Sequence, residues 1–246
     1  MKLIEVDAFH GKEFLILCIN GESFFYKKNA ATLAAMLTFA PPSPAAHVGA
    51  SSVHPLRSAG HAPHVPPVRL ADPADLPAIQ VLYAHHVLQG LASFEEIPPD
   101  VDELRARLAA VQAAGLPYLV AEIDGQVVGF AYASLYRARS AYRHTVEDSV
   151  YVAPGWAGRG IGAALLGEVI RWCEAGPWRQ MLAVVGQGDE NAGSMALHER
   201  MGFERIGALR SVGFKKGRWL DTGLMQRPLG AGSATLPVSI PVGQPR

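Results

Sequence analysis

The sequence has little cysteine, no long apolar run and no excess of either charge. Its two cysteines, Cys18 and Cys173, lie far apart in 246 residues, so a disulfide framework is not expected and a reducing compartment is. No stretch reaches the roughly 18–20 apolar residues that span a bilayer. Glu5 and Asp7 interrupt the N-terminus, which is unlike a secretory signal. We therefore expect a soluble, cytoplasmic protein without a membrane anchor.

The charges balance, because Lys and Arg total 22 and Asp and Glu also total 22. A zero net charge gives no support for attachment to nucleic acid or to an anionic membrane surface. A hydrophobic content of 49% allows one good core and a small additional module.

Residues 1–40 are expected to form a small β-hairpin plus helix extension. Hydrophobic strands over residues 14–19 and 23–26 flank Asn20-Gly21, a strong hairpin signal. Asn29 is suited to cap a helix over residues 30–39, which two prolines would end. No motif indicates what this extension does.

Two further segments are expected to lack fixed structure. Residues 41–66 are rich in Pro, Ala, Ser and His and read as a flexible linker, and residues 230–246 read as a disordered tail. Four histidines fall in the linker, which raises a metal site as an alternative. Their spacings place no pair on one helix face and no cysteine joins them, so we expect no metal.

Residues 67–229 carry the main domain, where apolar periodicity switches repeatedly between the strand and helix patterns. The expected order is β-α-α-β-β-β-α-β-α-β-β, an α/β protein with one mixed sheet and helices on both faces. Asp124-Gly125 predicts a type I′ hairpin turn. The helix after the glycine-rich turn should bury an apolar stripe made of Ile161, Leu165, Val169 and Trp172, and Cys173 should lie in the core.

A glycine-rich turn between a strand and this helix is the most informative feature. It reads Gly158-Arg-Gly160-Ile-Gly162 and follows the strand containing Glu147, Val150, Tyr151 and Val152. Glycines at alternate positions before a helix leave amides free to bind a phosphate or pyrophosphate. The alternative is a turn that merely reverses the chain. The turn lacks the Gly-Lys-Ser/Thr ending of a triphosphate loop, and it comes too late for a dinucleotide fingerprint.

A second motif follows about 30 residues later, running from Asn191 through Ser194 and His198 to Gly202-Phe203. Together with the glycine turn, it resembles the GNAT acetyltransferase superfamily over about residues 67–229. The segments Tyr142-Arg-His-Thr-Val-Glu147-Asp-Ser-Val-Tyr-Val and Gly217-Arg-Trp-Leu-Asp221 are similar to its phosphinothricin and methionine sulfoximine N-acetyltransferase branch.

The resemblance implies acetyl-CoA as the acetyl donor. The pantetheine arm would pair with the backbone of Val150, Tyr151 and Val152, and Asn191 would also contact it, with Ser194 beside it, although Asn191 could equally be a helix N-cap. Ala157 departs from the glutamine or arginine that the family prefers there. The residues that would cradle the pyrophosphate are Gly158, Arg159, Gly160, Ile161, Gly162 and Ala163.

The resemblance also assigns catalytic and acceptor residues. Glu147 would be the general base, against the alternative of a half-exposed carboxylate paired with Arg139 or Arg143. His198 stands where the branch has a histidine implicated in catalysis, against the alternative of a satisfied helix histidine. The residues expected to hold the acceptor are Arg137 and Arg139, which would grip its acidic groups, and Phe94 and Glu95 in a closing loop.

The sequence thus predicts an acetyl-CoA-dependent N-acetyltransferase that acts on the α-amine of a small amino-acid-like molecule, such as phosphinothricin or methionine sulfoximine, by direct transfer. A homodimer is expected from the same resemblance. Two alternatives remain open: acetylation of another amine, such as a polyamine, a drug or a protein N-terminus, and a non-catalytic acyl-CoA-binding module whose extension recruits a partner.

Overall fold

The computed structural model describes residues 2–9, 12–19, 22–27, 67–237, 239 and 241. The chain divides into two compact units, Met1–Ala62 and Pro63–Arg246, which are described separately.

The first unit contains a three-stranded antiparallel sheet of β1 (Lys2–Phe9), β2 (Lys12–Ile19) and β3 (Glu22–Lys27), in that order. The β2–β3 pair corresponds to the predicted hairpin. Strand β1 was not predicted, although Ile4, Val6 and Ala8 alternate there with polar residues as in a strand. The helix predicted over residues 30–39 and the linker predicted over residues 41–66 lie outside the described residues.

The second unit is built on a seven-stranded sheet in the order β4-β5-β6-β7-β8-β10-β9. Only the central β7–β8 pair is parallel; the other pairs are antiparallel. The strands are β4 (Val68–Leu70), β5 (Tyr118–Ile123), β6 (Gln126–Leu135), β7 (Thr145–Val152), β8 (Gln180–Gly186), β9 (Glu204–Lys215) and β10 (Arg218–Pro228).

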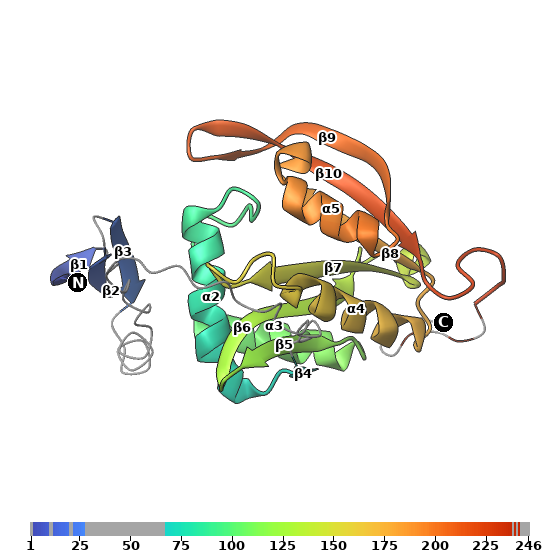
Figure 1. Ribbon diagram of the computed structural model, residues 1–246, viewed down its shortest axis with the longest axis horizontal. Helices are drawn as coiled ribbons and strands as arrows, with labels where there is room; N and C mark the ends of the chain where they lie inside the picture. The colour runs from blue at the N-terminus through green and yellow to red at the C-terminus, as the bar shows by residue number, and fades with distance from the viewer. Residues whose placement is uncertain are drawn as a thin grey trace, which may run out of the picture. The chain divides into compact units, whose positions relative to one another are not determined.

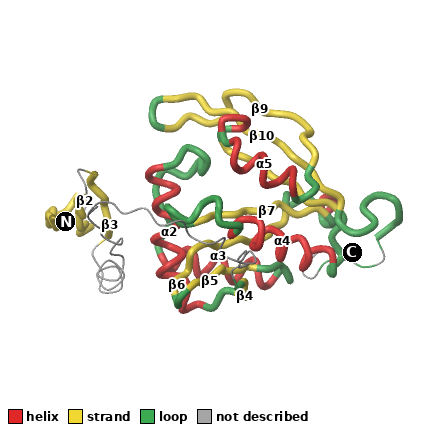
Figure 2. Tube along the Cα trace, in the orientation of Figure 1, coloured by secondary structure: helices red, strands yellow, loops and turns green. Residues whose placement is uncertain are grey.

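Four α-helices join these strands: α2 (Leu76–Gln89), α3 (Val101–Ala113), α4 (Ile161–Glu174) and α5 (Ala192–Arg200). Short 3₁₀ turns occur at Pro73–Asp75, Ser140–Tyr142 and Gly188–Glu190. The order of strands and α-helices confirms the predicted β-α-α-β-β-β-α-β-α-β-β arrangement (Figure 2).

Helices cover both faces of this sheet, as two neighbouring residues of β6 show. Gly129 faces α4, since a Cβ built on it would lie 3.0 Å from side-chain atoms of Ile161 and of Leu165. The next residue, Phe130, points to the other face, where its ring meets Tyr83 of α2 edge-on at 6.1 Å. Figure 1 shows α4 lying along the central strands. Helix α4, which follows the glycine-rich turn, and helix α2 therefore lie on opposite faces of the sheet.

The backbone conformation at two turns suits the residues that the sequence places there. Asp124 and Gly125 both have positive φ, 51° and 77°, as the predicted type I′ turn requires. Gly160 has φ 81° at the N-cap of α4, a conformation that suits glycine.

The stripe predicted on α4 is wrong at Trp172, which is half-exposed, while Cys173 is fully buried as expected. The Trp172 indole instead donates to the carbonyl of Gly115 at 3.2 Å.

The two central strands separate part of the way along. Their parallel pairing runs from Thr145–Gln180 to Asp148–Ala183, whereas β7 continues to Val152 and β8 to Gly186. Beyond Asp148 the facing backbone groups of β7 and β8 therefore have no partners in each other. An opening results in the middle of the sheet.

The C-terminal segment, predicted to be disordered from residue 230, is described to residue 237. Arg179 donates a hydrogen bond to the carbonyl of Thr235 at 2.8 Å, which holds this part of the segment near the start of β8. Among the helices of the described residues, none is both long and apolar enough to cross a membrane.

Candidate active site

A cavity of about 530 Å³ opens where β7 and β8 separate. It is walled by the loop after α2, by the two diverging strands and by the start of α5. The predicted residues that line it are Phe94, Glu95, Glu147, Val150, Tyr151, Asn191, Ser194 and His198. Residues from widely separated parts of the sequence thus meet at one place.

Glu147 and Asp148 approach this cavity from opposite faces of β7. In the β6–β7 register, Glu147 is paired with Ser134, in line with Tyr132 and Phe130 on the α2 face. Asp148 is paired with Ala133, in line with Gly129 on the α4 face. Since the cavity reaches through the opening between β7 and β8, both carboxylates line it.

Glu147 has the electrostatics of a base that works near neutral pH. Burial raises the pKa of Glu147 to about 7, the neighbouring charge of Asp148 adds to this, and Arg137 opposes it. The arginine that acts on this pKa is Arg137, rather than the Arg139 or Arg143 of the predicted alternative. A carboxyl group that titrates near pH 7 can accept a proton from an α-ammonium, whose pKa is about 7.7–8.

His198 is paired with Asp148 inside the protein. Its Nε2 lies 3.0 Å from Asp148 Oδ2, and its Nδ1 donates to the carbonyl of Ser194 at 2.7 Å. Burial alone would lower the pKa of His198, but the hydrogen bond and charge of Asp148 outweigh it and the pKa is raised. The second oxygen, Asp148 Oδ1, is buried without a hydrogen-bond partner among the described residues. Sequence reasoning did not assign Asp148 a role, because its partner lies 50 residues away.

The backbone of the glycine turn is available to bind an anion. Within the part of the chain that the structure describes, the amides of residues 157–163 donate no hydrogen bond, and the first intrahelical bond of α4 is Ala164 N–H to Gly160. The amide of Trp156, by contrast, donates to Ala153 at 3.1 Å. The predicted cradle is therefore free over the residues assigned to it, Gly158 to Ala163.

The three predicted turn glycines differ in what surrounds them. A Cβ on Gly158 or Gly160 would meet no atom within 4 Å, and both glycines have positive φ. A Cβ on Gly162 would approach Leu197 of α5 to 3.2 Å, so this glycine allows close packing. Arg159 stacks its guanidinium on Trp156, 4.7 Å from the ring centre.

The edge of β7 is only partly free. Val150 and Tyr151 line the cavity, as expected for residues beside a pantetheine arm. Val152 does not, and its carbonyl already accepts a hydrogen bond from His86 Nε2 of α2 at 2.9 Å. Burial lowers the pKa of His86, so the ring is a neutral donor. No motif distinguished His86 in the sequence.

The two arginines predicted to grip the acceptor do not line the cavity. Both Arg137 and Arg139 are exposed in the segment before β7. Arg137 lies against the rings of Tyr136 and Tyr142, with its guanidinium carbon 5.0 and 5.9 Å from the ring centres. It is near enough to lower the pKa of Glu147.

The loop containing Phe94 and Glu95 does close one wall of the cavity, as predicted. A buried lysine holds it: Lys215 at the end of β9 donates to the carbonyls of Val87 at 2.7 Å and Ser93 at 2.6 Å. Phe94 lies over Gly213 of β9, where any Cβ would come within 2.3 Å of its ring. These contacts fix the loop to the β9–β10 hairpin.

Asn191 and Ser194 combine the two roles that the sequence suggested. The side-chain oxygen of Asn191 accepts from the amide of Ser194 at 3.4 Å, as an N-cap does, and its amide nitrogen donates to Gly186 at 3.3 Å. Both residues also line the cavity. No group of three or more His, Cys, Asp or Glu side chains among the described residues could hold a metal.

Comparisons with known proteins agree with this geometry. The Acetyltransferase (GNAT) family matches residues 81–203. The chain is 60% identical over 170 residues to the phosphinothricin N-acetyltransferase of Alcaligenes faecalis, covering 69% of this chain and 86% of that one. It is 40% identical over 162 residues to the L-methionine sulfoximine/L-methionine sulfone acetyltransferase of Salmonella typhimurium, covering 66% and 94%.

A solved structure is similar in both sequence and shape. The crystal structure of a GNAT superfamily phosphinothricin acetyltransferase from Sinorhizobium meliloti in complex with acetyl-CoA matches with a TM-score of 0.69 and 47% identity, over 71% of this chain and 94% of that one. The free amides before α4, the opening between β7 and β8 and these likenesses lead to one assignment. The chain belongs to the GNAT acetyltransferase family and is an N-acetyltransferase whose acetyl donor is acetyl-CoA.

Proposed function

We propose that this enzyme acetylates the α-amine of a small amino acid of the phosphinothricin or methionine sulfoximine kind, with Glu147 as the general base. The observation that carries the proposal is Glu147 itself: it lines the cavity, and its pKa of about 7 matches the proton it must accept. The names of the relatives from Alcaligenes faecalis and Salmonella typhimurium support the substrate class.

The donor would be held by backbone groups. The free amides of residues 157–163 are suited to its pyrophosphate, with the positive end of α4 behind them. The unpaired edges of β7 and β8 beyond Asp148 are suited to its extended arm, as in the addition of a strand. Acetyl-CoA supplies a thioester, whose acyl group passes to an amine directly in a ternary complex.

The protein would accept a proton from the acceptor on one side of β7 and supply a proton to the thiolate on the other. On the α2 face, Glu147 accepts a proton from the acceptor's ammonium group; near neutral pH this deprotonation costs only on the order of 1 kcal/mol. On the α4 face, the Asp148–His198 pair holds a proton beside the cavity for the departing thiolate. Both ring nitrogens of His198 are engaged, so its proton would reach the thiolate through the Asp148 carboxylate, or through the Ser194 hydroxyl, which gives its own proton and takes one from Nδ1 3.4 Å away.

The test is thiol release from acetyl-CoA by the purified full chain, with phosphinothricin, methionine sulfoximine, unsubstituted amino acids and diamines as acceptors. We expect turnover with the first two compounds, and its loss in Glu147→Gln with binding of acetyl-CoA retained. Turnover confined to diamines would overturn the acceptor assignment. Full activity of Glu147→Gln would overturn the role of Glu147.

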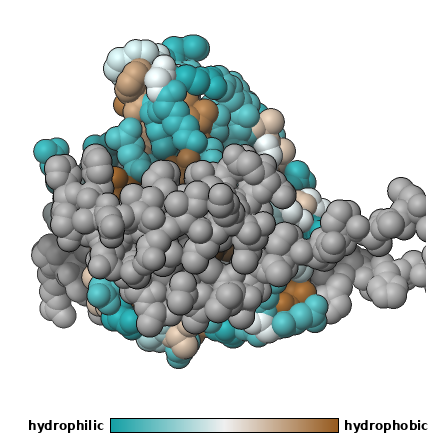
Figure 3. Space-filling view, turned by 90° about the vertical axis from the view of Figure 1, so that its left-hand side faces the viewer, coloured by the Kyte–Doolittle hydropathy of each residue, from teal (hydrophilic) through white to brown (hydrophobic). Residues whose placement is uncertain are grey.

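We also propose that the enzyme is a cytoplasmic homodimer. Apolar side chains are exposed on the β9–β10 hairpin, among them Ile206, Val212, Phe214 and Trp219 with exposed fractions of 53%, 53%, 58% and 66%. Figure 3 shows apolar patches among hydrophilic residues in the upper part of that view. β9 is also an edge strand, which favours association with a second copy. Light scattering on Phe214→Ser/Trp219→Ser against the unaltered chain tests this: a monomeric unaltered chain would refute it.

A further inference from the structure

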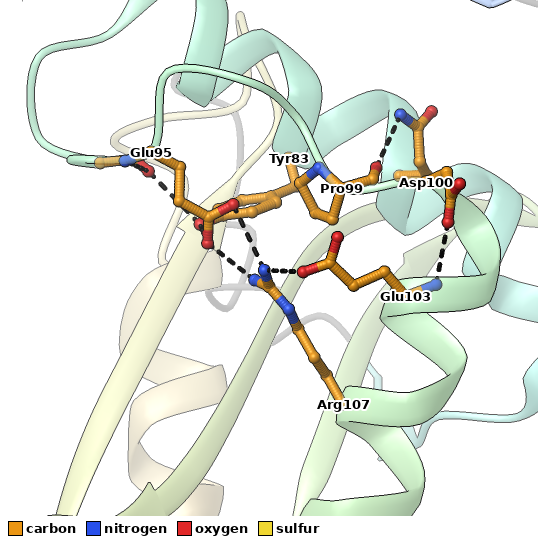
Figure 4. Close-up of polar contacts among 8 residues, drawn as sticks. Tyr83, Glu95, Pro99, Asp100, Glu103 and Arg107 are labelled. Carbon is orange, nitrogen blue, oxygen red and sulfur yellow. Dashed lines mark hydrogen bonds and ion pairs between the residues drawn. The ribbon is translucent and has the colours of Figure 1, made fainter.

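One carboxylate of the cavity wall has no part in the proposed proton route. Glu95 Oε1 accepts hydrogen bonds from the Tyr83 hydroxyl at 3.0 Å and from Arg107 Nη1 at 2.7 Å, and Arg107 Nη2 lies 3.4 Å from Oε2 (Figure 4). Arg107 therefore engages both oxygens of Glu95. Such a two-point contact fixes the geometry as well as the charge.

Three carboxylates determine the negative charge of the cavity wall. The carboxylates that line it are Glu95, Glu147 and Asp148. Asp148 faces His198. Glu147 is close to half-protonated at neutral pH. Glu95 is paired with Arg107, which also pairs with Glu103 outside the cavity.

Glu95 and Glu147 line the same cavity. Burial raises the pKa of the Tyr132 hydroxyl, the charges of Glu95 and Glu147 add to this, and the charge of Arg107 opposes it. Tyr132 itself lines the cavity. An acceptor placed with its amine at Glu147 would share the cavity with Glu95, whose carboxylate Arg107 binds from outside the cavity lining.

The structure holds Arg107 in place from behind. It lies on α3, where Asp100 caps the helix by accepting from the amide of Glu103 at 2.9 Å, and Glu103 pairs with Arg107 one turn later. Arg107 also lines a neighbouring cleft of about 270 Å³ that shares Tyr83 and Tyr132 with the main cavity. The guanidinium is thus fixed beside the acceptor side of the site.

We propose that Arg107 decides the charge of the acceptor that this enzyme takes, by cancelling Glu95. The inference rests on the proposed function and goes beyond it. With Arg107 present, the charge of Glu95 is compensated and an amino acid carrying acidic groups is accepted. Without it, Glu95 and Glu147 face the acceptor as two carboxylates, which repel an anion and attract a dication. Arg107 is a positioning and selectivity residue; it does not touch the reacting atoms.

The experiment compares kcat/KM for phosphinothricin with kcat/KM for 1,4-diaminobutane in four variants of the full chain. In Arg107→Gln we expect the ratio to fall by about tenfold or more. Arg107→Lys keeps the charge and should stay within about threefold of the unaltered enzyme. Glu95→Gln/Arg107→Gln removes both charges and should restore the ratio. Arg105→Gln, an exposed arginine on the same helix, is the control and should leave it unchanged.

A structural role for Arg107 predicts a different pattern, because damage to the fold lowers both activities together and removal of Glu95 does not repair it. An unchanged ratio in Arg107→Gln, or a double variant as altered as the single one, overturns the inference. Should the unaltered enzyme acetylate neither compound, the proposed function fails. The inference is then judged by the thermal stabilisation that each compound gives in the presence of CoA, where the same change of preference is expected.

Discussion

Asp148 and His198 form a buried hydrogen-bonded pair across 50 residues of sequence, with 3.0 Å between Oδ2 and Nε2 and side chains only 2% and 5% exposed. The pair joins the middle of β7 to α5, next to the point where β7 and β8 separate. It therefore supports the α4 side of the site as well as lining the cavity.

Replacing His198 with alanine should be strongly destabilising, because it leaves the Asp148 carboxylate buried without its partner. A loss on the order of 3–5 kcal/mol in the free energy of unfolding is expected by urea denaturation. Asp148→Ala/His198→Ala should lose less than the sum of the single variants. Because the folded-state pKa of His198 is raised, its contribution is complete below the ordinary value of 6.5 and is lost as pH rises through the folded pKa. A purely additive double variant would contradict the pairing.

Replacing Glu147 with glutamine should lower kcat/KM by about 10²–10⁴-fold, the usual contribution of a general base. In the unaltered enzyme kcat/KM should rise with pH through about 7, as the carboxyl loses its proton. Stability should move the opposite way: a raised carboxyl pKa favours the folded state below about 4.5, and this is lost as pH rises through about 7. Thermal unfolding against pH should accordingly be flatter in Glu147→Gln. A rate profile without an acid limb near pH 7 would contradict the assignment.

The two exposed arginines before β7 should behave differently. Arg137 lowers the pKa of Glu147, so Arg137→Ala should raise that pKa and move the acid limb of kcat/KM to higher pH. Arg139 is not among the groups that shift this pKa, and Arg139→Ala should leave the limb in place. The measurement is kcat/KM across pH 5.5–9, a range on both sides of an ordinary α-amine. Equal shifts in the two variants would show that the effect is not specific to Arg137.

Alanine at Gly160 should weaken binding of acetyl-CoA without disturbing the core. Its Cβ would meet open space, so the cost comes from the left-handed backbone, about 1–2 kcal/mol. If that strain is relieved by moving the turn, the free amides no longer converge, and calorimetry should show about a 5–30-fold rise in Kd. Gly193→Ala on α5 also meets open space but has no positive φ, and it should leave affinity unchanged. Equal affinities in the two variants would argue against the amide cradle.

Methionine in place of Lys215 should loosen the acceptor side of the site. The carbonyls of Val87 and Ser93 would lose their donor, at a cost on the order of 2–4 kcal/mol for two buried acceptors. Since Ser93 adjoins Phe94 and Glu95, the KM for the acceptor should rise more than that for acetyl-CoA. Lys216→Met removes a longer, exposed contact to Gln89 and should have little effect. A parallel rise in both KM values would indicate general damage.

Local signals in the sequence predicted what depends on neighbouring residues. The Asp124-Gly125 turn and the order of elements in the second unit follow from backbone preferences and periodicity, and both were confirmed. The family motifs brought Glu147, Asn191 and His198 to one cavity. The apolar stripe predicted on α4 was wrong at Trp172, whose indole donates a hydrogen bond to the carbonyl of Gly115 between α3 and β5.

Contacts between distant segments could not be predicted. Nothing in the spacing relates Asp148 to His198, Glu95 to Arg107, or Lys215 to the loop after α2, since each pair is set by the register of strands and the tilt of helices. The three arginines before Glu147 suggested a carboxylate clamp, yet Arg137 and Arg139 stay on the surface, because their segment leaves the sheet before β7 begins. The arginine that the structure places against a side chain of the cavity wall is Arg107 of α3, which binds Glu95.

Where β7 and β8 separate, unpaired backbone groups lie inside the sheet rather than at its outer edge. Unsatisfied main-chain groups along a sheet's outer margin invite other polypeptides to add themselves. Here they line a notch that is closed at Asp148 and Ala183 and flanked on both sides by strands already paired to β6 and β10. An extended small-molecule ligand fits between the two strands, whereas a β-strand of another protein could enter only by disrupting the sheet. A gap enclosed in this way offers unpaired backbone groups to a ligand without adding another free edge to the sheet.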